Sequence, residues 1–143
     1  MRKRLERQEE IRKIVRRERI RTQRDLVERL RTLGYVCTQA TVSRDISEMG
    51  LRKLPEGVYV LSEDLHLQRM ISDLVLNVVR SDNLVLVKAS TGTASGVAAA
   101  LDQAELPEVL GSIAGDDTVL VIAHDVTAAE QLVDHLDKFR GRR

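Results

Sequence analysis

The sequence predicts an α+β protein of two domains, and three observations support this fold class. Three helical segments and a short β-hairpin come first, and an order ββαββα follows, which favours a small sheet covered by helices. The net charge also changes sign along the 143 residues. Residues 1–61 hold 16 Lys and Arg against nine Asp and Glu, a net charge of +7, whereas residues 62–143 hold seven against 13, a net charge of −6. This split suggests that the first domain alone meets a polyanion, although chance clustering of surface charge would also produce it.

The first two helices are predicted from apolar spacing and from capping residues. In residues 4–17, apolar side chains recur at helical intervals among Arg and Glu. Thr22, with Asp25 three residues on, forms a variant of the capping box and predicts the start of the second helix. Gly34 is placed just after its end, at a position where glycine is favoured. The buried stripe of this second helix is expected to contain Leu26, Val27, Leu30 and Leu33.

The stretch from Thr38 to Met49 predicts a third helix with two distinct faces. Thr38 is the expected N-cap, and an apolar stripe at i, i+4 and i+7 packs on a core. The opposite face carries short polar side chains and Arg44, whose planar guanidinium fits a guanine edge or a phosphate. An ordinary amphipathic helix with a solvated face would have the same pattern. The stripe consists of Val42, Ile46 and Met49, and the polar face of Ala40, Ser43, Arg44 and Ser47.

A β-hairpin is predicted directly after the third helix. Two short alternating strands, 51–54 and 58–61, flank a Pro-Glu-Gly turn. Two helices, a short turn, a third helix and a hairpin together predict a winged helix-turn-helix domain over residues 1–61. Arg52 and Lys53 on the hairpin are then expected to reach the DNA backbone.

The second domain is predicted over residues 73–143, after a linker over residues 62–72 that contains a turn or two of helix. Its order ββαββα predicts an α/β sandwich-type domain, and Thr127 with Glu130 forms a capping box that opens the last helix. Several valines look too apolar for water on a sheet with helices on one face only, so either further helices of this chain or another subunit must cover the other face. The domain is expected to oligomerise. These valines are Val75, Val85, Val87, Val119 and Val121. The predicted strands are 74–79, 84–89, 109–114 and 118–123, and a helix covers 93–104.

Composition excludes several classes of protein. Hydrophobic residues make up 43% of the chain but aromatic residues only 2%, so the cores are expected to be aliphatic. Cys37 is the single cysteine, which excludes an internal disulfide framework and a cysteine-based zinc site, and it is expected to be a small buried residue. No metal and no cofactor are expected. The chain shows neither a membrane-spanning apolar run nor a signal peptide, so a cytoplasmic location is expected.

Two stretches of the second domain could bind a ligand. Asp116 and Asp117 follow a glycine in a turn, where adjacent carboxylates favour a cationic ligand, a metal or simply water. Thr91 to Gly96 is a Gly-rich loop that opens a helix and could hold an anion at the helix N-terminus. Together they suggest a zwitterion whose cationic tail meets the carboxylates, and a guanidinium suits such a pair.

At this point the chain resembles the bacterial arginine repressors over nearly its whole length. The resemblance implies a winged helix-turn-helix domain joined to a domain that forms trimers and, from two trimers, a hexamer. L-arginine, the corepressor, would bind at the interface between trimers. In the first domain the resemblance rests on Thr22-Gln23, Gly34-Tyr35 and Thr38 to Ile46. In the second it rests on Gly92 with Ala94, Val97-Ala98, Leu101-Asp102 and Gly111 to Thr118.

The resemblance also implies roles for individual residues. Ser43 and Arg44 would contact operator DNA, with Gln39, Thr41 and Gln23 beside them. Asp116 and Asp117 would take the arginine, and Asp102 would line the same site. Gly92, Thr93 and Ser95 are counted with the ligand loop.

The chain departs from the family pattern in three places of the second domain. Many members have Pro where Thr91 stands, and Gln, a ligand-contact residue, where Ser95 stands. Ser95 is shorter than Gln, so its direct contact with the ligand is expected to be reduced. Ser112 replaces a common Thr, which is a mild change.

The predicted function is an L-arginine-dependent transcriptional repressor of arginine biosynthesis genes, with catabolic genes as a further candidate target. A DNA-binding protein without a ligand, in which the Asp pair is only a turn, is one alternative. An enzyme fused to a winged helix is the other, and it lacks a His, a Lys or a second carboxylate pair at suitable spacing.

Overall fold

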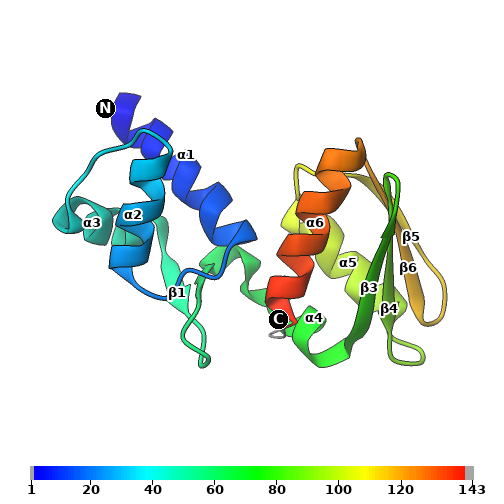
Figure 1. Ribbon diagram of the computed structural model, residues 1–143. Helices are drawn as coiled ribbons and strands as arrows, with labels where there is room; N and C mark the ends of the chain where they lie inside the picture. The colour runs from blue at the N-terminus through cyan, green and yellow to red at the C-terminus, as the bar shows by residue number, and fades with distance from the viewer. Residues whose placement is uncertain (1, 141–143) are drawn as a thin grey trace. The chain divides into compact units, whose positions relative to one another are not determined.

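The computed structural model describes residues 2–140, which divide into two compact units, the first ending at Ser62 and the second beginning at Glu63. The first unit contains three helices and a two-stranded antiparallel hairpin (Figure 1). This is the order of a winged helix-turn-helix domain, as the sequence predicts. The elements are α1 (Arg2–Arg17), α2 (Gln23–Thr32), α3 (Gln39–Met49), β1 (Leu51–Lys53) and β2 (Tyr59–Leu61).

Local capping chemistry fixes the ends of α2 and α3. The Thr22 hydroxyl accepts a hydrogen bond from the backbone N–H of Asp25 at 3.0 Å, and the Thr38 hydroxyl does the same for Thr41 at 3.2 Å. Both N-caps were predicted from the sequence. Gly34 follows α2 with φ +93°, a conformation that strains residues with a Cβ. Leu33, predicted in the buried stripe, is instead 41% exposed, because it caps the helix and turns away from the stripe.

The core of the first unit is aliphatic, as expected from the low aromatic content. Side chains from all three helices and the hairpin meet there, and Ile46 and Met49 of α3 pack against its edge. Cys37 also packs at this edge but is only half-buried, which corrects the expectation of a buried thiol. The core consists of Ile11, Ile14, Val15, Ile20, Leu26, Leu30, Val42, Leu51 and Leu61.

The second unit is a four-stranded antiparallel sheet with helices on one face (Figure 1). The strand order is β3-β4-β6-β5, so each hairpin contributes one central strand and one edge strand. The predicted order ββαββα is present, preceded by one further helix. The elements are α4 (Leu65–Leu74), β3 (Val75–Ser81), β4 (Leu84–Ala89), α5 (Ala94–Ala104), β5 (Val109–Ala114), β6 (Thr118–Ala123) and α6 (Val126–Phe139).

The segment expected to be a linker is instead an ordered part of the second unit. Residues 62–64 form a 3₁₀ turn, and α4 follows and packs on α5 and α6. Its buried residues Leu67, Gln68 and Ile71 give it an inward face. The turn or two of helix expected here is thus a helix of ten residues that belongs to the second unit.

Both faces of the sheet are apolar. The valines that were expected on the face without helices lie on the face that the helices cover. Alternating residues of β4 and β6 point under the helices, and they include the valines that were expected to need cover from further helices or from another subunit. Val85, Val87, Val119 and Val121 are all 0% exposed. These four valines therefore lie between the sheet and the helices, in the core of this unit.

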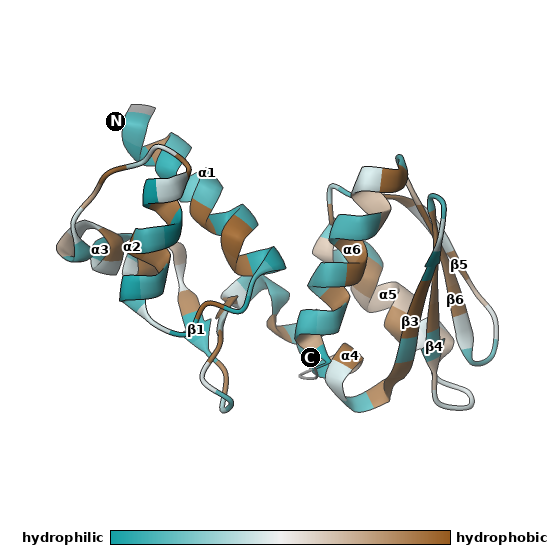
Figure 2. Ribbon diagram, viewed as in Figure 1, coloured by the Kyte–Doolittle hydropathy of each residue, from teal (hydrophilic) through white to brown (hydrophobic). Residues whose placement is uncertain are grey.

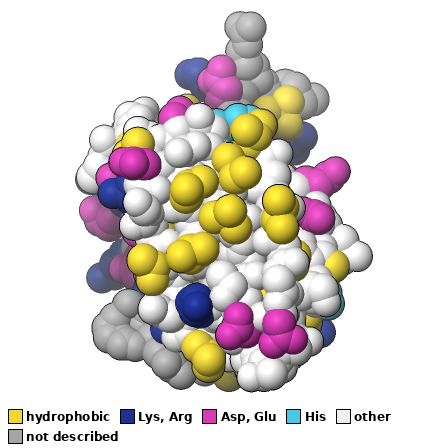
Figure 3. Space-filling model, turned by 90° about the vertical axis from the view of Figure 1, so that its right-hand side faces the viewer, with side chains coloured by type: hydrophobic (Ala, Val, Ile, Leu, Met, Phe, Trp, Pro, Cys, Tyr) yellow, Lys and Arg dark blue, Asp and Glu magenta, His cyan; other side chains and the backbone are white. Residues whose placement is uncertain are grey.

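The opposite face of the sheet carries a second apolar surface, here called the open face. The strands are hydrophobic along much of their length (Figure 2), and a yellow band crosses the sheet in Figure 3. Register places its members side by side, with Val79 opposite Leu86 and Leu86 opposite Leu120. The open face consists of Val79, Leu84, Leu86, Ile113, Leu120 and Ile122.

The last helix begins two residues earlier than the sequence predicts. Asp125, not Thr127, is the N-cap of α6, and its Oδ1 accepts a hydrogen bond from the N–H of Ala128 at 2.8 Å. Thr127 is the second helical residue and is exposed. Asp125 lies two residues before the predicted cap, and aspartate is at least as good an N-cap as threonine.

We expect Asp125→Ala to lower the free energy of unfolding by about 1 kcal/mol, because one backbone N–H of the first turn loses its acceptor. Thr127→Ala is the matched control and should change it by less than about 0.5 kcal/mol. Denaturant unfolding of both variants measures the difference. Equal losses in the two variants would contradict the assignment of the cap.

Candidate functional site

The outer face of α3 presents the predicted DNA-reading residues. Gln39, Ser43 and Arg44 are exposed, whereas Thr41 is half-buried and its hydroxyl lies 3.1 Å from that of Thr38. Among residues 2–140, Arg44 has no ion-pair or hydrogen-bond partner. An exposed, unpaired guanidinium on a helix of short side chains can approach a base edge or a phosphate closely.

The N-termini of α2 and α3 lie together at this face. Gln23 is the first residue of α2 and Gln39 the first of α3, and Gln39 Nε2 is 3.5 Å from Gln23 Oε1, at the outer limit of a hydrogen bond. Two helix N-termini side by side direct unpaired backbone N–H groups and partial positive charge to one place. This arrangement suits a DNA phosphate.

The hairpin carries the other predicted basic residues. Arg52 and Lys53 of β1 are exposed, and the Nζ of Lys53 lies 5.2 Å from the centre of the Tyr59 ring. Sequence reasoning did not identify Arg21, whose Nη1 donates to the carbonyl of Glu56 at the hairpin tip, 3.0 Å away. Arg21 therefore ties the hairpin loop to the segment between α1 and α2.

Behind α3 lies a polar cluster that sequence reasoning also missed. Asp45 is 1% exposed, and its carboxylate accepts bonds from Arg7 Nε at 2.5 Å, Arg7 Nη2 at 2.9 Å and Gln8 Nε2 at 2.9 Å. Burial raises the pKa of Asp45. The hydrogen bonds from Arg7 and Gln8, with the charges of Arg7 and Arg4, outweigh burial, so the net effect is a lowered pKa. Asp45 is therefore an anion held inside the domain.

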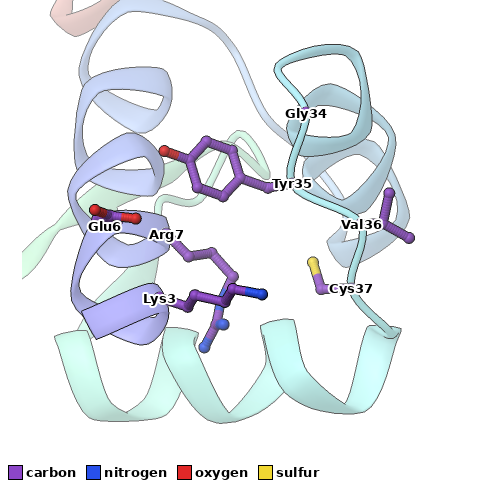
Figure 4. Close-up of a pocket in the computed structure, with 7 residues that line it drawn as sticks. All are labelled: Lys3, Glu6, Arg7, Gly34, Tyr35, Val36 and Cys37. Atoms are coloured by element: carbon purple, nitrogen blue, oxygen red, sulfur yellow. The ribbon is translucent and has the colours of Figure 1, made fainter. Parts of the chain in front are cut away.

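A pocket of about 360 Å³ lies beside this cluster, between α1 and the turn from α2 to α3 (Figure 4). Lys3 and Arg7 extend from α1 toward Cys37 on the opposite wall (Figure 4). Burial raises the pKa of the Cys37 thiol, Arg7 opposes that rise and Asp45 adds to it, with a net increase. The thiol is therefore mostly protonated at neutral pH and a weak nucleophile.

In the second unit, the structure brings the Gly-rich loop and the Asp turn together. Asp116 Oδ2 accepts a hydrogen bond from the N–H of Gly92 at 3.2 Å, and the Asp116 carbonyl accepts one from Ala94 at 3.1 Å. Gly92 has φ +79°. The Thr93 hydroxyl donates to the Ser90 carbonyl at 2.7 Å. Two of the loop's N–H groups, those of Gly92 and Ala94, are thus bonded to Asp116.

Asp117 is placed differently from its neighbour. Its carbonyl accepts a hydrogen bond from the N–H of Ala89 at 2.7 Å, so its backbone extends the pairing of the central strands β4 and β6 at one end of the sheet. Its side chain is exposed, and Oδ1 accepts from the Thr118 hydroxyl at 2.9 Å. The second carboxylate oxygen has no partner among residues 2–140. Asp117 is the carboxylate of the pair with capacity left for a cation.

Ser95 and Asp102 lie on the exposed side of α5. They are seven residues apart, which places them on one helix face about 10 Å from each other. The Asp102 Oδ1 lies 3.5 Å from the Ser112 hydroxyl of β5. No hydrogen bond or ion pair joins Asp102 to the Asp turn within residues 2–140. Within one chain, the predicted ligand residues therefore form a loop cluster and a separate residue, Asp102.

The described residues contain neither a metal-binding group nor a membrane-spanning helix. No group of three or more His, Cys, Asp or Glu in that part of the chain is arranged to hold a metal ion. No helix there is long and apolar enough to cross a membrane.

Comparison with known protein families distinguishes between the functions predicted from the sequence. Residues 1–67 match "Arginine repressor, DNA binding domain", and residues 71–138 match "Arginine repressor, C-terminal domain". The chain belongs to the arginine repressor family. Both matches fall on the two units described above and in the same order.

Individual arginine repressors are similar in sequence to this chain over nearly its whole length. An arginine repressor of Thermus thermophilus is 48% identical, with 90% of this chain and 85% of the relative covered. One from Caldicellulosiruptor saccharolyticus is 45% identical, with 92% and 93% covered. One from Carboxydothermus hydrogenoformans is 41% identical, with 94% and 97% covered. The chain is a DNA-binding transcriptional regulator of this family, and the alternative of an enzyme is set aside.

Proposed function

We propose that this protein represses arginine biosynthesis genes, with catabolic genes as a further candidate target, and that L-arginine is its corepressor. The observation that supports this most is the division of labour between the units. One presents Arg44 unpaired on an exposed helix face, and the other presents Asp117 with an unpaired carboxylate oxygen. We place this regulator in the cytoplasm, because it has to reach the bacterial chromosome.

The DNA-binding roles follow from position. Ser43 and Arg44 on α3 contact base edges, with Gln39 and Thr41 near the phosphate at the helix N-terminus. Gln23 contributes from the start of α2. Arg52 and Lys53 contact the backbone from the hairpin, where they add affinity without sequence information.

The two carboxylates have separate roles in this proposal. Asp116 already binds the N–H of Gly92, so it holds the ligand loop (Gly92, Thr93 and Ser95) in place. Asp117 pairs with the guanidinium of L-arginine, because charge-assisted bonds to a carboxylate are the strongest available to that group. Asp102 lines the site from a neighbouring subunit, since it lies apart from the loop within one chain.

The open face of the sheet is the surface through which subunits associate. Antiparallel sheets usually expose a polar face, and this one exposes six aliphatic side chains. We propose that three chains pack these faces together and that two such trimers form a hexamer. Arginine at the interface between trimers would then favour the assembled state by mass action.

The experiment that tests this function is operator binding, followed by fluorescence anisotropy at fixed salt on a palindromic site from the protein's own promoter. L-arginine should tighten binding and L-lysine should not, because only a guanidinium offers a planar pair of donors. Arg44→Ala should lose about 1–3 kcal/mol of operator binding in the presence of arginine. Tight binding that arginine does not change would favour the ligand-independent DNA-binding protein instead.

We expect Asp117→Asn to weaken L-arginine binding at least about tenfold, because a neutral amide replaces the guanidinium's counter-ion. Titration calorimetry of the intact protein measures this. Weak operator binding without arginine should remain, since the first unit is unchanged. Normal arginine affinity in this variant would rule out the role given to Asp117.

Ile113→Asp should shift the protein to a smaller assembly in analytical ultracentrifugation. Ile113 is 68% exposed in the single chain, so a charge there does not disturb the fold but opposes burial between subunits. Thr127→Asp, on an exposed position of α6, is the control and should leave the assembly unchanged. An unchanged mass for Ile113→Asp would place the subunit interface elsewhere.

A further inference from the structure

The contact between Arg7 and Asp45 joins two parts of the first unit that lie 38 residues apart. Arg7 comes from α1 and is only half-buried, whereas Asp45 sits on α3 and is 1% exposed. The guanidinium uses two nitrogens on two carboxylate oxygens, which fixes the angle between the groups as well as their distance. A bidentate pair of this kind restrains rotation of α3 about its own axis more than apolar contacts do.

Neighbouring polar groups extend this restraint along α3. Gln8 Nε2 lies 2.9 Å from Asp45 Oδ1 and also 2.9 Å from Glu48 Oε1. Arg4 lies 3.7 Å from Glu48 on the more exposed side. Residues 4, 7 and 8 of α1 therefore hold one turn of α3 from behind.

The restrained turn is the one that carries the DNA-reading residues. Arg44 immediately precedes Asp45, and Ser43 lies about 200° from Asp45 around the helix. A rotation of α3 that broke the Arg7 pair would therefore move both residues on the outer face. Of the apolar stripe, Val42 is fully buried, whereas Ile46 and Met49 are only half-buried, so much of the stripe opposes such rotation weakly.

The charge of Asp45 gives Arg7 a second effect. A buried carboxylate directly behind a recognition helix would repel the DNA phosphates, and a buried charge without a counter-ion is itself costly. Arg7 neutralises it from the side away from the DNA-reading face. Removal of Arg7 would leave the carboxylate unpaired next to Arg44.

We infer that Arg7 is a positioning residue for operator recognition, which sets the orientation of α3 through Asp45 without touching DNA. The inference rests on the DNA-binding role of the first unit. Arg7 is one of many basic residues on α1, and a phosphate contact would be the simpler assignment for it. Its bidentate engagement with a buried carboxylate separates it from the exposed basic residues of the same helix, such as Lys13.

The test compares Arg7→Gln with Lys13→Gln in the full-length protein, since both remove one positive charge from α1. Binding to the operator and to random-sequence DNA is measured across a range of salt concentrations. Arg7→Gln should lose roughly tenfold or more in operator affinity and much less for random DNA, because several base contacts are misplaced together. Its salt slope should equal the wild-type slope, because no phosphate contact is lost.

Three results would overturn the inference while the wild type still binds its operator. One is an unchanged operator affinity in Arg7→Gln. Another is a fall in the salt slope by about 1, with equal losses on both DNAs, which identifies a phosphate contact. The third concerns Ile14→Val, a core variant that destabilises the same unit. If its ratio of operator affinity to random-DNA affinity falls as much as that of Arg7→Gln, the effect is one of stability. Failure of the wild type to bind would instead overturn the proposed function.

Rescue gives an independent check. Asp45→Asn added to Arg7→Gln removes the unpaired carboxylate and restores a neutral pair that can form hydrogen bonds. The double variant should recover part of the operator-to-random ratio. No recovery would show that Arg7 does not act through Asp45.

Discussion

A recognition helix must leave its outer face free for DNA, so everything that fixes its orientation has to act from behind. In α3 this support consists of a thin apolar stripe and one buried carboxylate. The stripe gives burial energy, which is not directional, whereas the pair between Arg7 and Asp45 supplies direction. The remaining features of the first unit, including the capped α2 and the hairpin tied by Arg21, complete the frame around that helix.

The second unit meets a different constraint, because a sheet of four strands has two faces and only three helices to cover them. The helices bury one face of the two central strands, and the strand alternation leaves aliphatic side chains on the other. The ligand loop and the Asp turn lie at one end of the central strands of this same sheet and are joined by Asp116. A ligand that binds there acts on the unit that also carries the surface for association, and the linkage between ligand and assembly follows from that proximity.

Local features of the fold were predictable from the sequence, and long-range choices were not. At Thr22 and Thr38 the cap hydroxyl accepts a hydrogen bond from a backbone N–H three residues along the chain, so the local sequence is sufficient to predict it. The partner of Asp45 lies 38 residues distant, and no periodicity indicates it. The open face was misassigned because both faces are apolar, and only the arrangement of helices selects one. That Asp116 binds its own loop, rather than a ligand, depends on how two turns meet in space.

The placement of the aromatic residues has a spectroscopic consequence. The chain has no tryptophan and two tyrosines, Tyr35 beside the pocket and Tyr59 on the hairpin, and both belong to the first unit. The single phenylalanine, Phe139, lies in the second unit and contributes little where tyrosine absorbs and emits. Intrinsic fluorescence of the intact protein therefore reports on the DNA-binding unit alone, with the Tyr59 ring directly beneath Lys53. The second unit has neither tyrosine nor tryptophan and gives no such signal. Tyrosine fluorescence can therefore follow the first unit, while calorimetry follows ligand binding to the second.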